Sequence, residues 1–236
     1  VTVGDVRMTT GDKTDLSSRS HTWLNDRHMT AAQIILKCAH SNVAGLQAPT
    51  LQCTRTFEVH QEKQFVQILN LSKSHWIAIS TLNCQLGTVH VYDSMQLGLN
   101  SSLKRIVADL MFYKGKKITI KYMHIQQQKG SSDCGLFAIA TATALCNGVE
   151  PNQLQFDQKV MRNQLKMAIE QQTLGLFPAV HVARKPAVIT VGGSSAEAQM
   201  FPPDCPLQLT IAIDSLPGPS TAKKIVVDSP GGPIIV

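Results

Sequence analysis

One cysteine of this sequence stands where a thiol could act as a nucleophile. Residues 130–135, Gly-Ser-Ser-Asp-Cys-Gly, form a polar stretch that leads directly into an apolar, helix-like segment. A cysteine in the first turn of a helix meets unpaired backbone N–H groups and the positive end of the helix dipole, which favour the thiolate. Gly135 is expected to let a substrate approach the backbone closely. Cys134 is therefore a candidate nucleophile, although a lone cysteine is more often a small core residue.

A thiolate nucleophile needs an imidazole as its base, and the imidazole needs an acceptor that fixes its tautomer. Residues 75–82 and 88–92 have strand-like composition and flank a turn at 83–87, which predicts a β-hairpin. His75 would open the first strand and Asp93 would follow the second, so the hairpin would make them neighbours. Taken singly, they could equally be a surface histidine at a strand end and an aspartate that starts a turn.

Gln128 lies shortly before Cys134 and could add a third function. Its side-chain amide, together with the backbone N–H of Cys134, could form an oxyanion hole. Gln128 is also the last residue of a polar run, Gln126–Gln128. Spacing alone leaves open whether it faces the reacting carbon.

The elements expected to carry these residues alternate along the chain. Helices are expected at 27–39, 101–112, 133–145 and 155–171, and strands at 65–71, 75–82, 88–92 and 118–125. Asn25 or Asp26 would cap the first of these helices. Because the strands lie between helices while the hairpin is antiparallel, the predicted class is α+β.

Composition divides the chain into three parts. Residues 1–20 are polar and rich in turn formers, and residues 21–178 have the composition of a folded domain. Residues 179–236 contain eight of the eleven prolines and a single aromatic residue. Such a segment buries too little apolar surface to offset its ordering entropy, so it is predicted to be largely disordered. Within it, 207–213 and 225–227 are strand-like and could form a small addition.

The bulk composition narrows the function classes. The net charge is +6, but the lysines and arginines are scattered rather than clustered, so no nucleic-acid partner is expected. The six cysteines include no pair with the two-residue spacing of zinc sites, so neither metal nor cofactor is expected. The longest apolar stretch, 136–146, is about half of what a membrane span needs. With no secretory signal visible, we expect an intracellular protein of the cytoplasm and/or nucleus with reduced thiols.

The joint pattern resembles a known family. Ser74-His75-Trp76, Val91-Tyr92-Asp93-Ser94, Gln128 and Asp133-Cys134-Gly135 occur in the order found in the ubiquitin-like-protein proteases, and Trp23-Leu24-Asn25-Asp26 matches a further segment of those enzymes. These are the SUMO-specific peptidases and their adenovirus-protease relatives. The resemblance covers residues 20–175 and is greatest to compact versions carried by animal mobile elements and viruses. It implies a papain-like cysteine peptidase fold, with a central antiparallel sheet flanked by helices.

The resemblance also implies a substrate. Trp23 and Trp76, the only two tryptophans, would clamp the Gly-Gly tail of ubiquitin or a ubiquitin-like modifier such as SUMO. Asp26 would face a basic side chain of the modifier near that tail. The enzyme would be a cysteine-type peptidase or isopeptidase that cleaves after Gly-Gly through an acyl-enzyme. The segment between the hairpin and Cys134 lacks the long insertions that some members use to select substrates, so the identity of the modifier stays open.

Two other functions fit the same fold. Some bacterial relatives use the thiol for acetyl transfer, and a catalytically silent chain could simply bind ubiquitin-like proteins. A pure binding module has no need of His75, Asp93 and Cys134 together, and a fluorogenic modifier substrate would separate it from a peptidase. Alternatively, both tryptophans could be ordinary core anchors.

Overall fold

The computed structural model describes residues 1–17, 22–58, 63–98, 101–111, 117–183, 189–190 and 207–212. The elements are, in chain order, β1 (Thr2–Val3), β2 (Val6–Arg7), α1 (Thr10–Asp15), α2 (Asp26–Ala39), β3 (Ala44–Gly45), α3 (Leu51–Thr54), β4 (Phe65–Leu71), β5 (His75–Ser80), β6 (Thr88–Tyr92), α4 (Ser101–Met111), β7 (Lys117–Met123), α5 (Cys134–Cys146), a 3-10 turn (Pro151–Gln153), β8 (Leu154–Phe156), α6 (Gln158–Gln171), β9 (Ala179–His181), β10 (Ile189–Thr190) and β11 (Leu207–Ala212).

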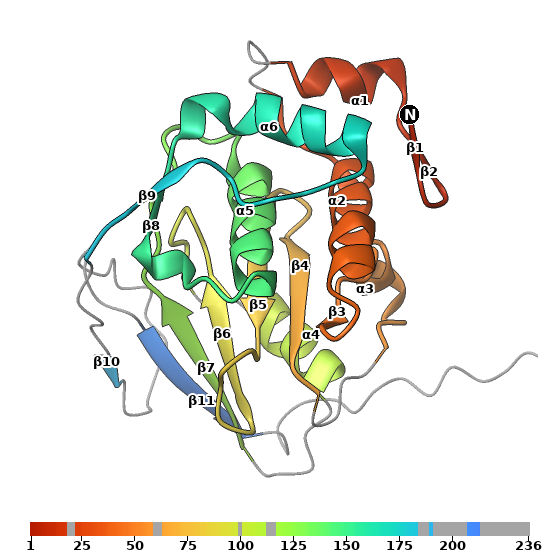
Figure 1. The fold of residues 1–236 in the computed structure, drawn as a ribbon. Coiled ribbons are helices and arrows are strands. Elements are labelled where there is room, and N and C mark those ends of the chain that lie inside the picture. The colour runs from red at the N-terminus through yellow and green to blue at the C-terminus, as the bar shows by residue number, and fades with distance from the viewer. Residues whose placement is uncertain are drawn as a thin grey trace, which may run out of the picture.

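A seven-stranded sheet runs through the middle of the molecule in the order β10-β11-β7-β6-β5-β4-β3. The predicted hairpin is present, since β5 pairs antiparallel with both β4 and β6. The sheet as a whole is mixed, because α4 carries the chain from β6 to a parallel β7. Helices α2, α5 and α6 lie on one side of the sheet and α4 lies on the other (Figure 1). The predicted α+β class is confirmed.

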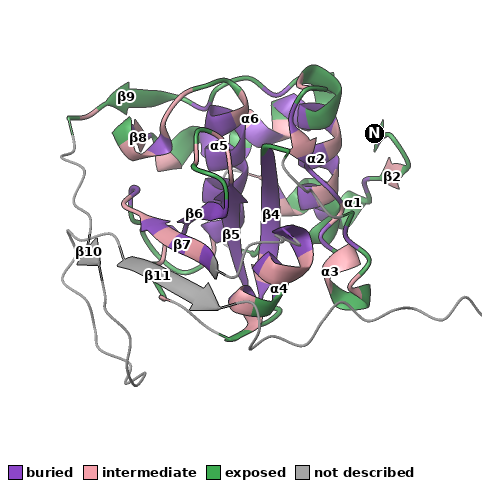
Figure 2. Cartoon of the chain, turned by 90° about the horizontal axis from the view of Figure 1, so that it is seen from below, coloured by how far each residue is buried: buried purple, intermediate pink, exposed green. Residues whose placement is uncertain are grey.

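Helix α5 lies at the centre of the larger core. Its residues are almost all buried, and it packs on β5 and β4 (Figure 2). A helix that is apolar on every side has no face for solvent, so its sequence dictates this central position. Small alanines along α5 let it lie close to the sheet. The first turn of α5, with Cys134, is thereby fixed against the strands that carry the candidate base.

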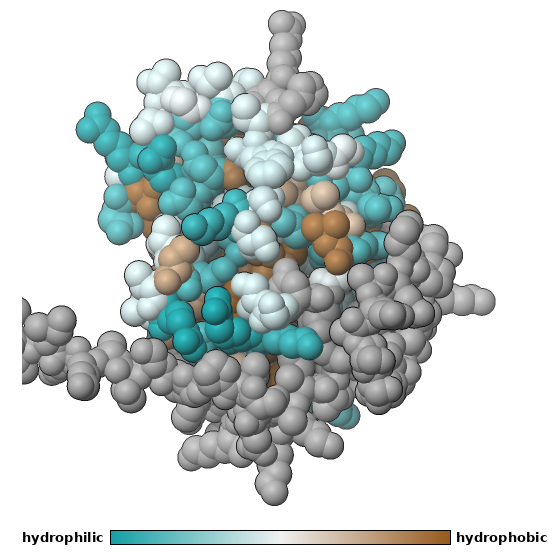
Figure 3. Space-filling model, turned by 180° about the vertical axis from the view of Figure 1, so that it is seen from behind, coloured by the Kyte–Doolittle hydropathy of each residue, from teal (hydrophilic) through white to brown (hydrophobic). Residues whose placement is uncertain are grey.

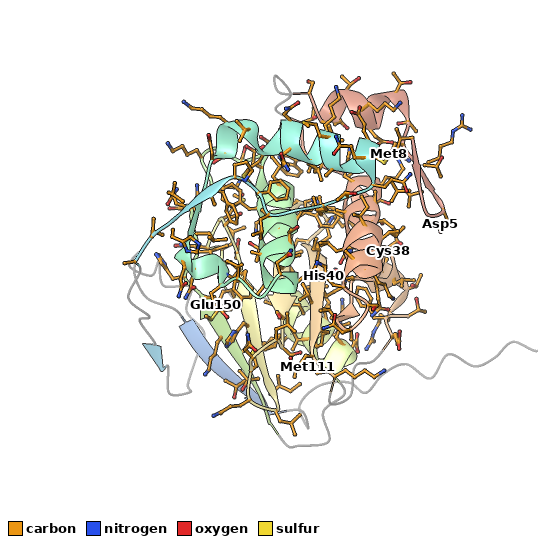
Figure 4. The ribbon with its side chains drawn as sticks, in the orientation of Figure 1. Asp5, Met8, Cys38, His40, Met111 and Glu150 are labelled. Carbon is orange, nitrogen blue, oxygen red and sulfur yellow. The ribbon has the colours of Figure 1, made fainter. Side chains whose placement is uncertain are left out.

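The segment predicted as a polar N-terminal stretch packs on this core. Val3, Met8 and Leu16 are buried in it, and Met8 lies beside α6 (Figure 4). Thr9 and Asp12 form a capping box at the start of α1. Composition concealed this packing because only a few apolar side chains of the segment make it. The predicted boundary at residue 20 therefore does not coincide with an edge of the core.

Two other expectations change in detail. The last helix was expected to begin at residue 155, but residues 154–156 form β8 with β9, and Asp157 caps α6 instead. In the segment from residue 179 onward, the strand-like stretch 207–213 matches β11, which pairs with β7. Residues 225–227 and Cys205 lie outside the described residues.

Seen from behind, the described part of the surface carries mainly hydrophilic residues and residues of intermediate hydropathy, and the apolar residues visible there form small separate groups (Figure 3). No helix within the described ranges is long and apolar enough to cross a membrane.

Candidate active site

The hairpin brings His75 and Asp93 into contact. In its register Ala78 lies opposite Tyr92, so Asp93, the next residue after β6, comes near the start of β5, where His75 lies. The Nε2 atom of His75 donates a hydrogen bond to Oδ1 of Asp93 over 2.7 Å, and both side chains are buried. The predicted pairing of base and carboxylate is therefore present in the structure.

The turn after β6 fixes the carboxylate of Asp93. Its Oδ1 atom also accepts the backbone N–H of Met95 over 2.8 Å, and its Oδ2 atom accepts that of Leu97 over 2.9 Å. A carboxylate held by two backbone donors has little freedom to turn away from the imidazole. Asp93 thus both starts the turn and holds the imidazole of His75. The sequence had offered these as two alternative interpretations of Asp93, and the structure shows both.

Cys134 is buried and is the first residue of α5. Because Asp93 occupies Nε2 of His75, Nδ1 is the ring nitrogen left for the thiol, and it has no hydrogen-bond partner among the described residues. Burial lowers the pKa of His75, but interactions with the side chains of Asp93 and Cys134 outweigh it and raise the pKa to about 9. The imidazolium is therefore favoured at neutral pH, as a thiolate–imidazolium pair requires.

Gln128 is buried beside this pair and its amide is held in one orientation. Oε1 accepts a hydrogen bond from Oγ of Ser94 over 2.7 Å, and Nε2 donates to the carbonyl of Gly130 over 2.9 Å. Ser94 follows Asp93 directly, so one turn positions both the carboxylate and the amide. In the sequence, Ser94 stands out only as the last residue of the Val91-Tyr92-Asp93-Ser94 motif. A hydroxyl next to the candidate carboxylate was the signal that could have indicated its role.

The structure also separates the three glutamines. Gln126 is buried and pairs through its amide with both backbone groups of Phe156, whereas Gln127 is exposed. Gln126 therefore anchors β8 to the loop before α5, and of the three only Gln128 contacts Ser94. His90, on β6, has its ring against that of Tyr92, and its pKa is lowered to about 4 by burial and by Lys121.

Gly135 has a different role from the expected one. A Cβ atom at this position would lie 2.7 Å from Cε of Met29, 3.1 Å from Cβ of Leu24 and 3.3 Å from Cδ1 of Trp76. The missing side chain therefore admits protein atoms rather than substrate. The expectation of a substrate approach at Gly135 is wrong because α5 lies too close to α2 and β5 to leave space there.

The two tryptophans lie on one groove but differ in exposure. Trp76 is 5 % exposed and its Nε1 donates to the carbonyl of Leu24 over 2.8 Å, whereas Trp23 is 49 % exposed. Both line a groove of about 880 Å³ that also includes Asp26 and Ser74. Trp76 is therefore partly a core anchor, as the alternative interpretation of the sequence proposed. Trp23 offers an open aromatic surface beside the site. The structure leaves Asp26 exposed at the start of α2.

One group of side chains has the composition of a metal site. Asp12, Asp15 and His28 come together near α1 and α2. The carboxylate of Asp12 is already bonded to Arg27, and both ring nitrogens of His28 contact backbone atoms. A neutral histidine with no free lone pair cannot ligate a metal, so these residues serve as a structural network.

Comparison with known proteins places this geometry in context. The family described as "Ulp1 protease family, C-terminal catalytic domain" matches residues 50–175. A search of the curated proteins returned no match.

Several solved structures share the fold. A structure of the SUMO protease Ulp1 with its catalytic cysteine oxidised to a sulfenic acid is 17% identical, with a TM-score of 0.56, over 72% of this chain and 87% of that chain. The C-terminal Ulp1 protease domain in complex with Smt3, the yeast ortholog of SUMO, is 17% identical, with a TM-score of 0.55, over 72% and 85%. A de-sumoylating protease is 15% identical, with a TM-score of 0.52, over 70% and 86%. The fold class predicted from the sequence is thereby confirmed.

Proposed function

Because the chain belongs to the Ulp1 protease family and is a cysteine peptidase, we propose that it hydrolyses the bond after the Gly-Gly tail of a ubiquitin-like modifier such as SUMO, or of ubiquitin. The partner is then the modifier together with its conjugates. One observation carries the proposal: a buried His75–Asp93 pair, joined over 2.7 Å, that leaves Nδ1 of His75 without a partner among the described residues and that interacts with Cys134 at the start of α5.

In the first half of the reaction, the imidazolium of His75 already holds the proton of the thiol, and the thiolate of Cys134 attacks the carbonyl carbon of the terminal glycine. A sulfur–carbon bond forms and the carbonyl oxygen becomes an oxyanion. His75 then gives its proton to the leaving amine as the carbon–nitrogen bond breaks, which leaves a thioester. Asp93 stabilises the imidazolium and holds its tautomer throughout.

In the second half, water attacks the thioester while His75 accepts one of its protons. The sulfur–carbon bond breaks, the thiol is restored and the tail is released as a carboxylic acid. The backbone N–H of Cys134 and the amide of Gln128 are the proposed oxyanion donors. Nε2 of Gln128 carries two protons and gives one to Gly130, so the other is left for the oxyanion.

The groove supports the proposed selection of glycine. Both tryptophans line the groove, Trp76 held by its bond to Leu24 and Trp23 exposed, and the narrow backbone of a glycine pair is proposed to bind between them. A methyl group on the substrate would meet their rings and lose the close contact on which binding depends. Asp26, exposed at the same groove, is placed to meet a basic side chain near the tail.

A panel of modifiers with C-terminal vinyl-sulfone groups tests the proposal directly. Wild type is expected to couple to at least one member, and Cys134→Ala to none. Cys38→Ala is the matched control, because Cys38 is an exposed thiol on α2, remote from α5 in sequence, and its loss should leave coupling unchanged (Figure 4). Coupling that survives Cys134→Ala and disappears in another cysteine variant would overturn the assignment.

Specificity needs a separate measurement. Matched fluorogenic modifiers that end in Gly-Gly and Ala-Gly are to be assayed with wild type and with Trp76→Ala. Wild type is expected to cleave only the first. Equal cleavage of both by wild type would mean that there is no glycine slot and that the peptidase has another specificity.

A further inference from the structure

Arg162 on α6 makes contacts that the proposed mechanism does not use. Its guanidinium is buried, and Nη2 donates to Oδ1 of Asp133 over 2.7 Å and to the carbonyl of Thr22 over 2.8 Å. Nη1 donates to the carbonyl of Asp15 over 2.7 Å. Asp133 directly precedes Cys134, and Thr22 directly precedes Trp23. One side chain thus joins the nucleophile turn to the segment that forms one wall of the groove.

A second residue of α6 completes the contact with Asp133. Gln158 lies one helical turn before Arg162, on the same face. Its Nε2 atom donates to Oδ2 of Asp133 over 2.7 Å and to the carbonyl of Lys129 over 2.8 Å, while its Oε1 atom accepts the N–H of Lys129 over 2.9 Å. Both carboxylate oxygens of Asp133 and the loop before it are therefore held by α6.

The position of Asp133 makes this arrangement informative. Asp133 is the N-cap residue of α5, where an aspartate normally accepts hydrogen bonds from the first N–H groups of the helix. Here its side chain caps nothing and turns instead to Arg162 and Gln158. The first N–H groups of α5 are consequently not taken up by that carboxylate. They stay available to the thiolate of Cys134 and to an oxyanion formed beside it.

We infer that Arg162, assisted by Gln158, is a positioning residue that acts on both halves of the active site. Through Asp133 it keeps the carboxylate off the first turn of α5 and fixes the turn that bears Cys134. Through the carbonyl of Thr22 it fixes the approach to Trp23. The second role concerns substrate binding and rests on the proposed function, whereas the first concerns the thiol alone.

The two roles predict different effects for two conservative variants. Arg162→Lys keeps the charge but replaces the planar fork by a single ammonium, which cannot reproduce all three contacts. It is expected to disturb both Cys134 and Trp23. Asp133→Asn keeps an acceptor for Arg162 but turns a donor toward Nε2 of Gln158, so it is expected to disturb Cys134 alone.

The effect of Arg162 on the reactivity of the Cys134 thiol is measured without any modifier. The rate at which iodoacetamide alkylates Cys134 is followed by mass spectrometry of its peptide, which separates it from the exposed Cys38 and Cys53. Both Arg162→Lys and Asp133→Asn should slow this alkylation at least fivefold while circular dichroism shows a folded protein. Ile169→Val is the matched control, since it removes one buried carbon from the same helix and should leave the rate within twofold of wild type.

The effect of Arg162 on Trp23 and on the groove is measured in two ways. Acrylamide reports mainly on the exposed Trp23, because Trp76 is buried, and quenching should rise in Arg162→Lys but not in Asp133→Asn. With a cleaved modifier in hand, KM should rise at least threefold in Arg162→Lys and stay within twofold in Asp133→Asn, while kcat falls in both.

The outcomes separate this inference from the proposed function. If wild type cleaves no modifier, the proposed function fails, while alkylation and quenching still judge the role of Arg162. If Arg162→Lys lowers stability as Ile169→Val does but leaves alkylation and quenching unchanged, Arg162 is merely structural and the inference is overturned. If Arg162→Lys slows alkylation without changing quenching, the joint action on both halves is refuted.

Discussion

At the scale of single residues, the site depends on side chains that each satisfy two requirements. Asp93 accepts the imidazole N–H and also two backbone N–H groups of its own turn. Gln128 is held by Ser94 and Gly130, so the direction of its amide is set before any substrate arrives. Such preorganisation matters because donors that are already oriented need no rearrangement as charge develops on the substrate.

Ser94→Ala tests this preorganisation. The substitution leaves Oε1 of Gln128 buried without its partner, so the amide can turn and present its oxygen to the developing negative charge. We expect kcat to fall roughly 10- to 100-fold, up to the lower end of the ~10²–10³-fold loss known for removal of an oxyanion donor, with little change in KM. Steady-state kinetics on a modifier substrate measures both. Ser94→Thr, which retains the hydroxyl, should keep more of the activity, and equal rates for wild type and Ser94→Ala would refute the role of this bond.

The raised pKa of His75 gives a pH prediction. Its protonated form is favoured up to a pKa of about 9, so activity that depends on the imidazolium should persist at neutral pH and fall as pH rises through that value. In Asp93→Asn the negative charge that helps to raise the pKa is gone, and the alkaline limb of the rate profile should shift to lower pH. The pH dependence of kcat/KM for both proteins checks this. An unshifted limb in Asp93→Asn would show that another group titrates.

At the scale of elements, the position of α5 decides how close its first turn comes to β5 and α2. Helix and strand can approach closely there because Gly135 has no side chain, and this approach brings Trp76 beside the turn that carries Cys134. The hairpin supplies the other half of the site through its register. The two halves meet only because α5 packs on the strand that begins with His75.

Gly135→Ala should therefore disturb the site through packing. Its Cβ atom would press on Met29, Leu24 and Trp76, and overpacking of this kind costs about 1–3 kcal/mol of unfolding free energy. We expect a lower denaturation midpoint and slower turnover. Gly11→Ala is the control, because Gly11 is a helical glycine of α1 with only Thr9 Oγ1 nearby, at 3.7 Å. A Gly135→Ala variant as stable and active as wild type would show that the contact relaxes freely.

At the scale of the whole molecule, residues from the N-terminal segment and from α6 meet around the segment that carries Trp23. The N-terminal segment reaches α2 through Asp12, whose buried carboxylate accepts bonds from Thr9, Asn25 and Arg27. Helix α6 reaches the same region from the other end of the sequence through Arg162. The segment with Trp23 is thus held between two parts of the chain that lie far apart in sequence.

Asp12 makes the stability of the fold depend on pH in the acid range. Burial raises the pKa of Asp12, but hydrogen bonds from Arg27, Asn25 and Thr9 outweigh it and hold the pKa well below the usual 3.8. A lowered pKa in the folded state stabilises the fold above the unfolded-state pKa, and this contribution is lost as pH falls below it. Asp12→Asn should cost about 1.5–3 kcal/mol at pH 7, as for a hydrogen-bonded charged group. Urea melts of both proteins should converge between pH 4 and pH 2, and a gap that stays constant would refute the linkage.

The sequence alone determined the local elements and the order of the chemical groups. The apolar stretch after Cys134 had to form a buried helix, because a segment with no polar face has nowhere else to lie. The turn between two strand-like segments likewise had to bring His75 to Asp93, since an antiparallel hairpin pairs the start of one strand with the end of the next. These conclusions need only neighbours along the chain, and periodicity and turn chemistry report on such neighbours.

Features that depend on contacts between distant segments became visible only in the folded chain. In the folded chain Gly135 makes a packing contact where a substrate contact was expected. Of the three glutamines in the polar run, Gln128 is the one whose amide is hydrogen-bonded to Ser94. Folding also packed Val3, Met8 and Leu16 into the core and joined Arg162 to Asp133, 29 residues earlier in the chain. The physical reason is that burial and hydrogen-bond partners are set by which surfaces meet when the helices pack on the sheet. Residue type and spacing carry no direct record of that.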